Sequence, residues 1–91
     1  KNIIRCQADD YYTNFYLNDG RRIMISKTLK ENEELLKDHN FIRPHRSHLV
    51  NMAYIKRYVK SDGGYIILAD ATKIPVSRRK KDVIVNYLQG L

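Results

Sequence analysis

The feature of this sequence that most constrains its fold is a set of glycine-containing turn segments flanked by residues that alternate between two sides of a strand. Residues 12–17 alternate between two sides and include aromatic and β-branched side chains, which is typical of a strand. Asp19-Gly20 supplies the positive φ that a tight hairpin needs, so a return strand is expected over residues 21–26. A second hairpin turn is expected at residues 61–64, and further strands at residues 2–7, 41–43, 55–60, 65–68 and 73–76. Because hairpin-length connections join antiparallel strands, the sequence predicts antiparallel sheets.

Two helices are expected, and the start of the second is unusual. Thr28-Leu29-Lys30-Glu31 is a capping box, which predicts a middle helix over residues 29–38. Ser77 is a good N-cap, and apolar residues at i, i+3, i+4 and i+7 from Ile84 predict an amphipathic C-terminal helix. The cations Arg78 to Lys81 then fall in its first turn, where each is unfavourable by about 0.3–1 kcal/mol at low salt. A bound phosphate would reverse that sign, so we favour an anion site over a solvated basic face.

The net charge of +7 resides in the second half of the chain. Residues 1–40 hold seven basic and seven acidic residues, whereas residues 41–91 hold ten basic and three acidic ones. The stretch from Phe41 to Lys60 contains five cations and two histidines but no carboxylate. So uneven a distribution suggests a polyanionic partner.

Several classes of protein find no support in the sequence. No run of about eighteen apolar residues exists, so no membrane partner is expected. A single cysteine, Cys6, provides neither a disulfide nor a zinc site, which fits a reducing, cytoplasmic location. The His-x-x-His spacing of His45 and His48 has no further ligand nearby, so neither a metal nor another cofactor is expected. No catalytic arrangement or small-molecule site stands out, so an enzyme is not expected. Residues 1–91 are expected to be one domain, cut from a longer protein because the chain begins with Lys.

Residues 41–51 collect side chains that suit nucleic acid. Arg, His, Ser and Asn donate hydrogen bonds to phosphates and to base edges. Arginine can bond guanine and asparagine can bond adenine in a bidentate manner, each worth roughly 1–3 kcal/mol of discrimination. A structural role is equally open for one of the two histidines. Among the seven tyrosines, only Tyr11 and Tyr12 lie beside a loop where they could stack on bases.

The chain resembles the LytTR DNA-binding domain, the output domain of many bacterial two-component response regulators. The likeness covers nearly the whole chain, including a strand–turn–strand that leads into Thr28-Leu29-Lys30. Its most specific segments are Phe-x-Arg-x-His-Arg-Ser-x-x-Val-Asn at residues 41–51 and Ile-Pro-Val-Ser-Arg-Arg at residues 74–79. A chance match at both segments with this spacing is improbable.

The resemblance implies a mostly-β, elongated fold of small antiparallel sheets with a middle helix and a C-terminal helix. It also implies three loops that dock into successive major grooves, paired protomers on direct repeats, and a receiver domain before this one. By the resemblance, the expected base contacts are Tyr11, Asn51 and Arg79. The expected backbone contacts or loop supports are His45, Arg46, Ser47, Ser77, Arg78 and Lys80. The function expected is sequence-specific binding of double-stranded DNA for transcription regulation, and binding of RNA or single strands is the alternative.

Overall fold

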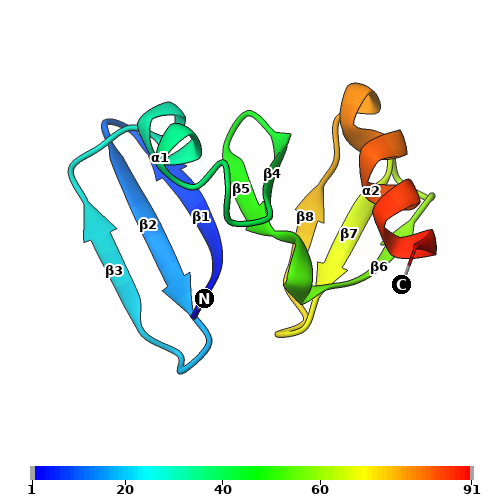
Figure 1. Cartoon of the computed structure of the whole chain (residues 1–91), viewed down its shortest axis with the longest axis horizontal. Coiled ribbons are helices and arrows are strands. Elements are labelled where there is room, and N and C mark those ends of the chain that lie inside the picture. Colours follow the sequence, from blue (N-terminus) through cyan, green and yellow to red (C-terminus); the bar gives the residue numbers. More distant parts are fainter. Residues whose placement is uncertain (1, 91) are drawn as a thin grey trace.

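The computed structural model describes residues 2–90, and it confirms a mostly-β fold of two antiparallel sheets with two α-helices. The larger sheet has the order β3-β2-β1-β5-β4. Its strands are β1 (Ile3–Asp9), β2 (Tyr12–Leu17), β3 (Arg22–Ile25), β4 (Phe41–His45) and β5 (His48–Asn51). The smaller sheet consists of β6 (Ile55–Val59), β7 (Tyr65–Leu68) and β8 (Lys73–Pro75), in that order. The two sheets lie side by side along the longest axis, which measures 34 Å against 25 Å for the other two (Figure 1).

Both hairpin turns form where the sequence predicts them. Gly20 has a φ of 91° in the β2–β3 turn, and Gly64 has a φ of 95° in the β6–β7 turn. Both values lie in the left-handed region, which glycine adopts without steric cost. At Gly64 there is a further reason, because a Cβ atom there would collide with the hydroxyl of Tyr58. The turn chemistry of the sequence therefore explains the registers of both hairpins.

The middle helix, α1 (Leu29–Leu35), begins as predicted and ends early. Thr28 Oγ1 accepts a hydrogen bond from the Glu31 amide at 3.2 Å, and Glu31 Oε1 accepts one from the Thr28 amide at 2.8 Å, which confirms the capping box. The helix was expected to reach residue 38, but Leu36 already has a non-helical backbone. A left-handed Asn40, with a φ of 66°, then redirects the chain into β4.

The C-terminal helix is split into two parts. A 3-10 turn, η2 (Arg78–Lys80), precedes α2 (Lys81–Gln89), and a second short turn, η1 (Met52–Tyr54), connects β5 to β6. Ser77 stands before η2 as expected, although its side chain makes no capping hydrogen bond. The amide of Lys80 instead bonds the Ser77 carbonyl at 3.0 Å. Arg78, Arg79 and Lys80 therefore lie in a tight turn ahead of α2, whereas Lys81 is the first residue of the helix, as expected.

Two groups of buried side chains hold these elements together. Beneath α1, Cys6, Leu29 and Leu49 pack on one face of the larger sheet. The other group joins both sheets and α2, and its members are Ile4, Ile42, Val50, Ile55, Ile66, Leu68, Ile74, Val76 and Ile84. Because this group contains residues from both sheets, their loops are held in a fixed relation to one another.

Candidate nucleic-acid interface

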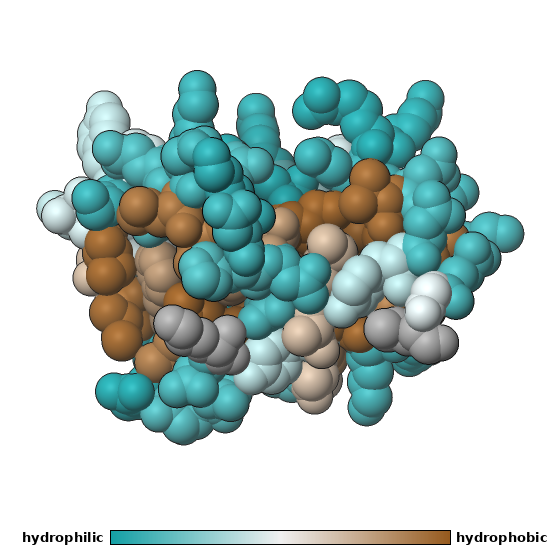
Figure 2. Space-filling view, viewed as in Figure 1, coloured by the Kyte–Doolittle hydropathy of each residue, from teal (hydrophilic) through white to brown (hydrophobic). Residues whose placement is uncertain are grey.

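Three loops lie along one edge of the molecule, at the top of Figure 1. We call this the loop edge, and it comprises the β1–β2 turn (Asp10 and Tyr11), the β4–β5 turn (Arg46 and Ser47) and η2. Hydrogen bonds connect the three loops through the strands that carry them. The Ala8 amide bonds the Ser47 carbonyl at 3.0 Å, and the Ser77 amide bonds the Pro44 carbonyl at 2.7 Å. Hydrophilic side chains project along this edge in Figure 2.

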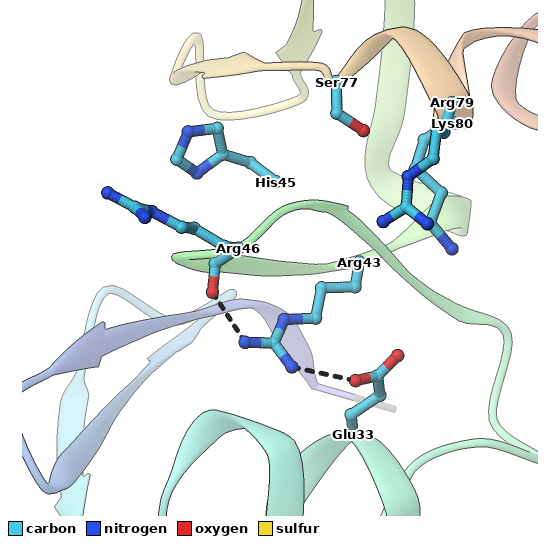
Figure 3. Close-up of a pocket in the computed structure, with 7 residues that line it drawn as sticks. All are labelled: Glu33, Arg43, His45, Arg46, Ser77, Arg79 and Lys80. Carbon is cyan, nitrogen blue, oxygen red and sulfur yellow. Dashed lines mark hydrogen bonds and ion pairs between the residues drawn. The ribbon is translucent and has the colours of Figure 1, made fainter.

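A depression of about 480 Å³ lies between the β4–β5 turn and η2 (Figure 3). Its lining residues are Glu33, Arg43, His45, Arg46, Ser77, Arg79 and Lys80, and we call it the cationic depression. The structure thus brings together five of the residues expected to contact DNA, from segments about 30 positions apart in sequence. Arg78 faces a separate hollow, which Tyr58, Lys60 and Lys81 also line.

The cations at this edge have no acidic partners within the described residues. In residues 2–90 the ion pairs join Arg21 to Asp19, Lys37 to Glu34 and Arg43 to Glu33. None involves Arg46, Arg78, Arg79, Lys80 or Lys81. Unpaired charges of one sign around a hollow focus a positive potential outward, which attracts a polyanion. The positive end of α2 points the same way.

Arg43 and His45 support the β4–β5 turn from below. Arg43 Nη2 donates to the Arg46 carbonyl at 2.7 Å, while Nη1 donates to Glu33 Oε1 at 3.0 Å. His45 Nδ1 accepts a hydrogen bond from the Ser47 amide at 3.1 Å. Both side chains therefore fix the backbone of the turn, whereas the Arg46 side chain is exposed and extends away from the Arg43 guanidinium (Figure 3).

His48 lies half-buried behind the same turn and contributes no positive charge near neutral pH. Its ring centroid is 5.5 Å from that of His45. Burial lowers the pKa of His48 to about 4, and the positive charges of His45 and Arg5 act in the same direction. The His48 ring therefore adds nothing to the positive potential of the loop edge near neutral pH.

Tyr11 is presented to solvent at the far end of the loop edge. Its side chain is 76% exposed, and Asp10 before it has a left-handed backbone with a φ of 59°. Tyr11 does not line the cationic depression. It therefore lies at the loop edge but outside the cationic depression.

Asn51, in contrast, does not lie at the loop edge. It ends β5 at the opposite end from the β4–β5 turn, and only 3% of its surface is exposed. Its Nδ2 donates to the Ile3 carbonyl at 3.0 Å, and its Oδ1 accepts from the Ala53 amide at 3.0 Å. This placement does not favour the predicted base contact, because the Asn51 side-chain amide is occupied by hydrogen bonds to β1 and to the start of η1. The sequence could not distinguish the two roles, because the same amide chemistry serves both.

Replacing Asn51 by alanine is expected to lower stability rather than alter base choice. The change leaves the Ile3 carbonyl and the Ala53 amide without their side-chain partner, which should reduce the free energy of unfolding by about 1–3 kcal/mol. Urea unfolding followed by circular dichroism measures this loss. Asn86→Ala, on the exposed side of α2, is the control and should be neutral or slightly stabilising. A stable Asn51→Ala chain that no longer distinguishes DNA sequences would contradict this assignment.

Sequence reasoning did not select three residues that line the two hollows. Lys60 and Lys81 line the hollow beside Arg78, although only their membership of cationic stretches pointed to them. Glu33 lines the cationic depression, and nothing in the sequence indicated it, because an acid in a helix reads as a solvated surface residue. Among residues 2–90, no group of three potential ligands is placed to hold a metal ion. No helix in that part of the chain is long and apolar enough to cross a membrane.

A mostly-β domain that presents unpaired cations from two neighbouring loops along one edge is a nucleic-acid-binding module by its architecture and charge. The chain belongs to the LytTR family, because the family model described as the LytTr DNA-binding domain matches residues 1–89. A solved LytTr DNA-binding domain from Bacillus cereus superimposes with a TM-score of 0.79 and 25% identity, over 96% of this chain and 81% of that one. The protein is therefore a DNA-binding domain with the LytTR fold.

Curated relatives are transcriptional regulators and sensory proteins. The sensory transduction protein LytT of Oceanobacillus iheyensis is 46% identical over 85% of this chain and 37% of its own length. The heme-containing CO-sensing transcriptional regulator RcoM 2 of Paraburkholderia xenovorans is 34% identical over 88% of this chain and 31% of its own length. The chain thus spans about a third of these relatives, and its family role is DNA binding in transcription regulation.

Proposed function

We propose that this domain recognises a specific sequence in double-stranded DNA and serves as the output domain of a two-component response regulator. The proposal of a DNA-binding surface rests on one observation, the unpaired cations of the cationic depression and η2. The likeness to LytT proteins, named for sensory transduction, supports the regulator context. On this proposal the 91 residues are one domain of a longer cytoplasmic protein with a receiver domain before it.

The proposed base contacts come from the tip of each loop. Arg79 and Arg46 have planar guanidinium groups that suit the O6 and N7 acceptors of guanine, and both line the cationic depression without an ion pair. Tyr11 supplies the third contact from the exposed β1–β2 turn. Arg46 takes the place first expected for Asn51, because its side chain is at the loop edge and the Asn51 amide is buried.

The proposed phosphate contacts surround these tips. Lys80 and Arg78 stand on opposite sides of η2, and Ser77 has a side-chain hydroxyl that makes no capping bond. Ser47 and His45 complete the set at the β4–β5 turn. Such contacts fix the register of a protein on the duplex without reading its sequence. Two protomers on a direct repeat would each use this set.

Selection of bound duplexes from a random pool, followed by fluorescence anisotropy, tests the proposal. The selected duplex should bind more tightly than a scrambled one. The logarithm of affinity should fall with the logarithm of salt concentration with a slope of about −2.7 to −4.5, for three to five neutralised phosphates. Single-stranded DNA and RNA should compete poorly. Competition by single strands as strong as by the selected duplex would favour the alternative, in which the exposed Tyr11 and Tyr12 stack on bases.

A further inference from the structure

The cationic depression contains one carboxylate among its lining residues, that of Glu33 on α1. A negative charge beside the path of a phosphate backbone opposes binding, because like charges repel across a binding interface. The acid Glu34, its neighbour in sequence, points elsewhere and pairs with Lys37 at 2.8 Å. Because the charge of Glu33 weakens phosphate binding at the depression that it lines, we expect this residue to have a second role that offsets the cost.

The contacts of Glu33 show what that role is. Its Oε1 lies 3.0 Å from Nη1 of Arg43, whose other terminal nitrogen donates to the Arg46 carbonyl at 2.7 Å. The Arg43 side chain is only 24% exposed, so this ion pair is better shielded than the others in the described chain. In Figure 3 the guanidinium turns toward α1 and away from Arg79. One planar group thus joins a helix to the tip of a DNA-facing turn.

We propose that Glu33 is a positioning residue that sets sequence specificity by holding Arg43 against α1. Held there, Arg43 fixes the carbonyl of Arg46 and with it the direction in which the Arg46 side chain leaves the turn. Glu33 also keeps the Arg43 charge away from phosphates, where it would add affinity for any sequence. The inference rests on the proposed function, since it concerns how the same edge distinguishes one duplex from another.

The proposal predicts opposite effects on two duplexes. In Glu33→Gln the loss of one negative charge and the release of Arg43 should raise affinity for a scrambled duplex about twofold to threefold and steepen the salt slope by about 0.9. Affinity for the selected duplex should fall by about tenfold at the same salt, because Arg46 loses its fixed direction. Anisotropy titrations of both duplexes over a salt series measure these changes.

Glu34→Gln is the matched control, since it removes the same charge from the same helix outside the cationic depression. It should raise affinity for both duplexes slightly and equally. A Glu33→Gln chain that behaves in this way would overturn the proposal, because Glu33 would then be only a repulsive charge. Wild-type protein with equal affinity for both duplexes would overturn the proposed function along with it.

A double-mutant cycle distinguishes positioning from any general structural effect. In an Arg43→Gln background, Glu33→Gln should cause no further loss of preference for the selected duplex, because both residues act through one group. Additive losses would contradict the proposal. Arg43→Lys provides an independent variant, since lysine keeps the charge but lacks the fork that reaches two partners at once. It should lower affinity for the selected duplex, and full retention of the preference would count against the mechanism.

Discussion

Arg79→Ala is expected to abolish most of the sequence preference of the domain. Affinity for the selected duplex should fall by about 10- to 100-fold, because a bidentate arginine–guanine pair contributes roughly 1–3 kcal/mol of discrimination. The variant also loses one positive charge that attracts the phosphates. Affinity for a scrambled duplex should fall only a few-fold. Arg79 is suited to this role because it lines the cationic depression and has no ion pair within the described residues. Anisotropy titrations with both duplexes measure the ratio of the affinity for the selected duplex to that for the scrambled one.

Lys80→Ala is the matched control for this effect. It removes an adjacent charge from the same turn, η2, so any general loss of positive potential is shared between the two variants. As a phosphate contact, Lys80 should contribute equally to all sequences, and its loss should reduce the magnitude of the salt slope by about one. Equal losses on selected and scrambled duplexes in both variants would remove Arg79 from the base-reading set.

Much of the fold followed from local sequence signals. The bounds of β2 and β7 agree with the expected ones, because alternation and Asp-Gly turns act over a few residues. The capping box likewise located the start of α1. The end of α1 was missed by three residues, since it depends on Asn40 turning the chain into β4.

The candidate site was predictable where it depended on charge and not where it depended on packing. The cationic turn at residues 78–81 was evident because four cations adjoin in sequence. The burial of Asn51 follows from its contact with the Ile3 carbonyl, 48 residues away, which no local pattern reveals. The ion pair of Glu33 with Arg43 likewise forms only when α1 packs beside β4. Tertiary contacts therefore decide which of several suitable polar side chains is exposed at the loop edge.

The position of α2, which directly follows the η2 cations, depends on its contact with the buried group that joins both sheets. Ile84 is fully buried in the group that joins both sheets, and it is the residue of α2 that is buried there. With nine residues, α2 is too short to persist as a helix without such packing. Whatever loosens Ile84 should therefore loosen η2, which immediately precedes the helix.

Ile84→Ala is accordingly expected to lower the free energy of unfolding by about 2–5 kcal/mol, a large part of the stability of a domain this small. Urea unfolding measures the loss, and Val83→Ala, at a neighbouring position that is 48% exposed, should cost far less. At a temperature where Ile84→Ala remains folded, binding of both duplexes should also weaken, because the η2 cations lose their fixed direction relative to the β4–β5 turn. A loss in stability no greater than that of Val83→Ala would show that α2 does not hold η2 in place.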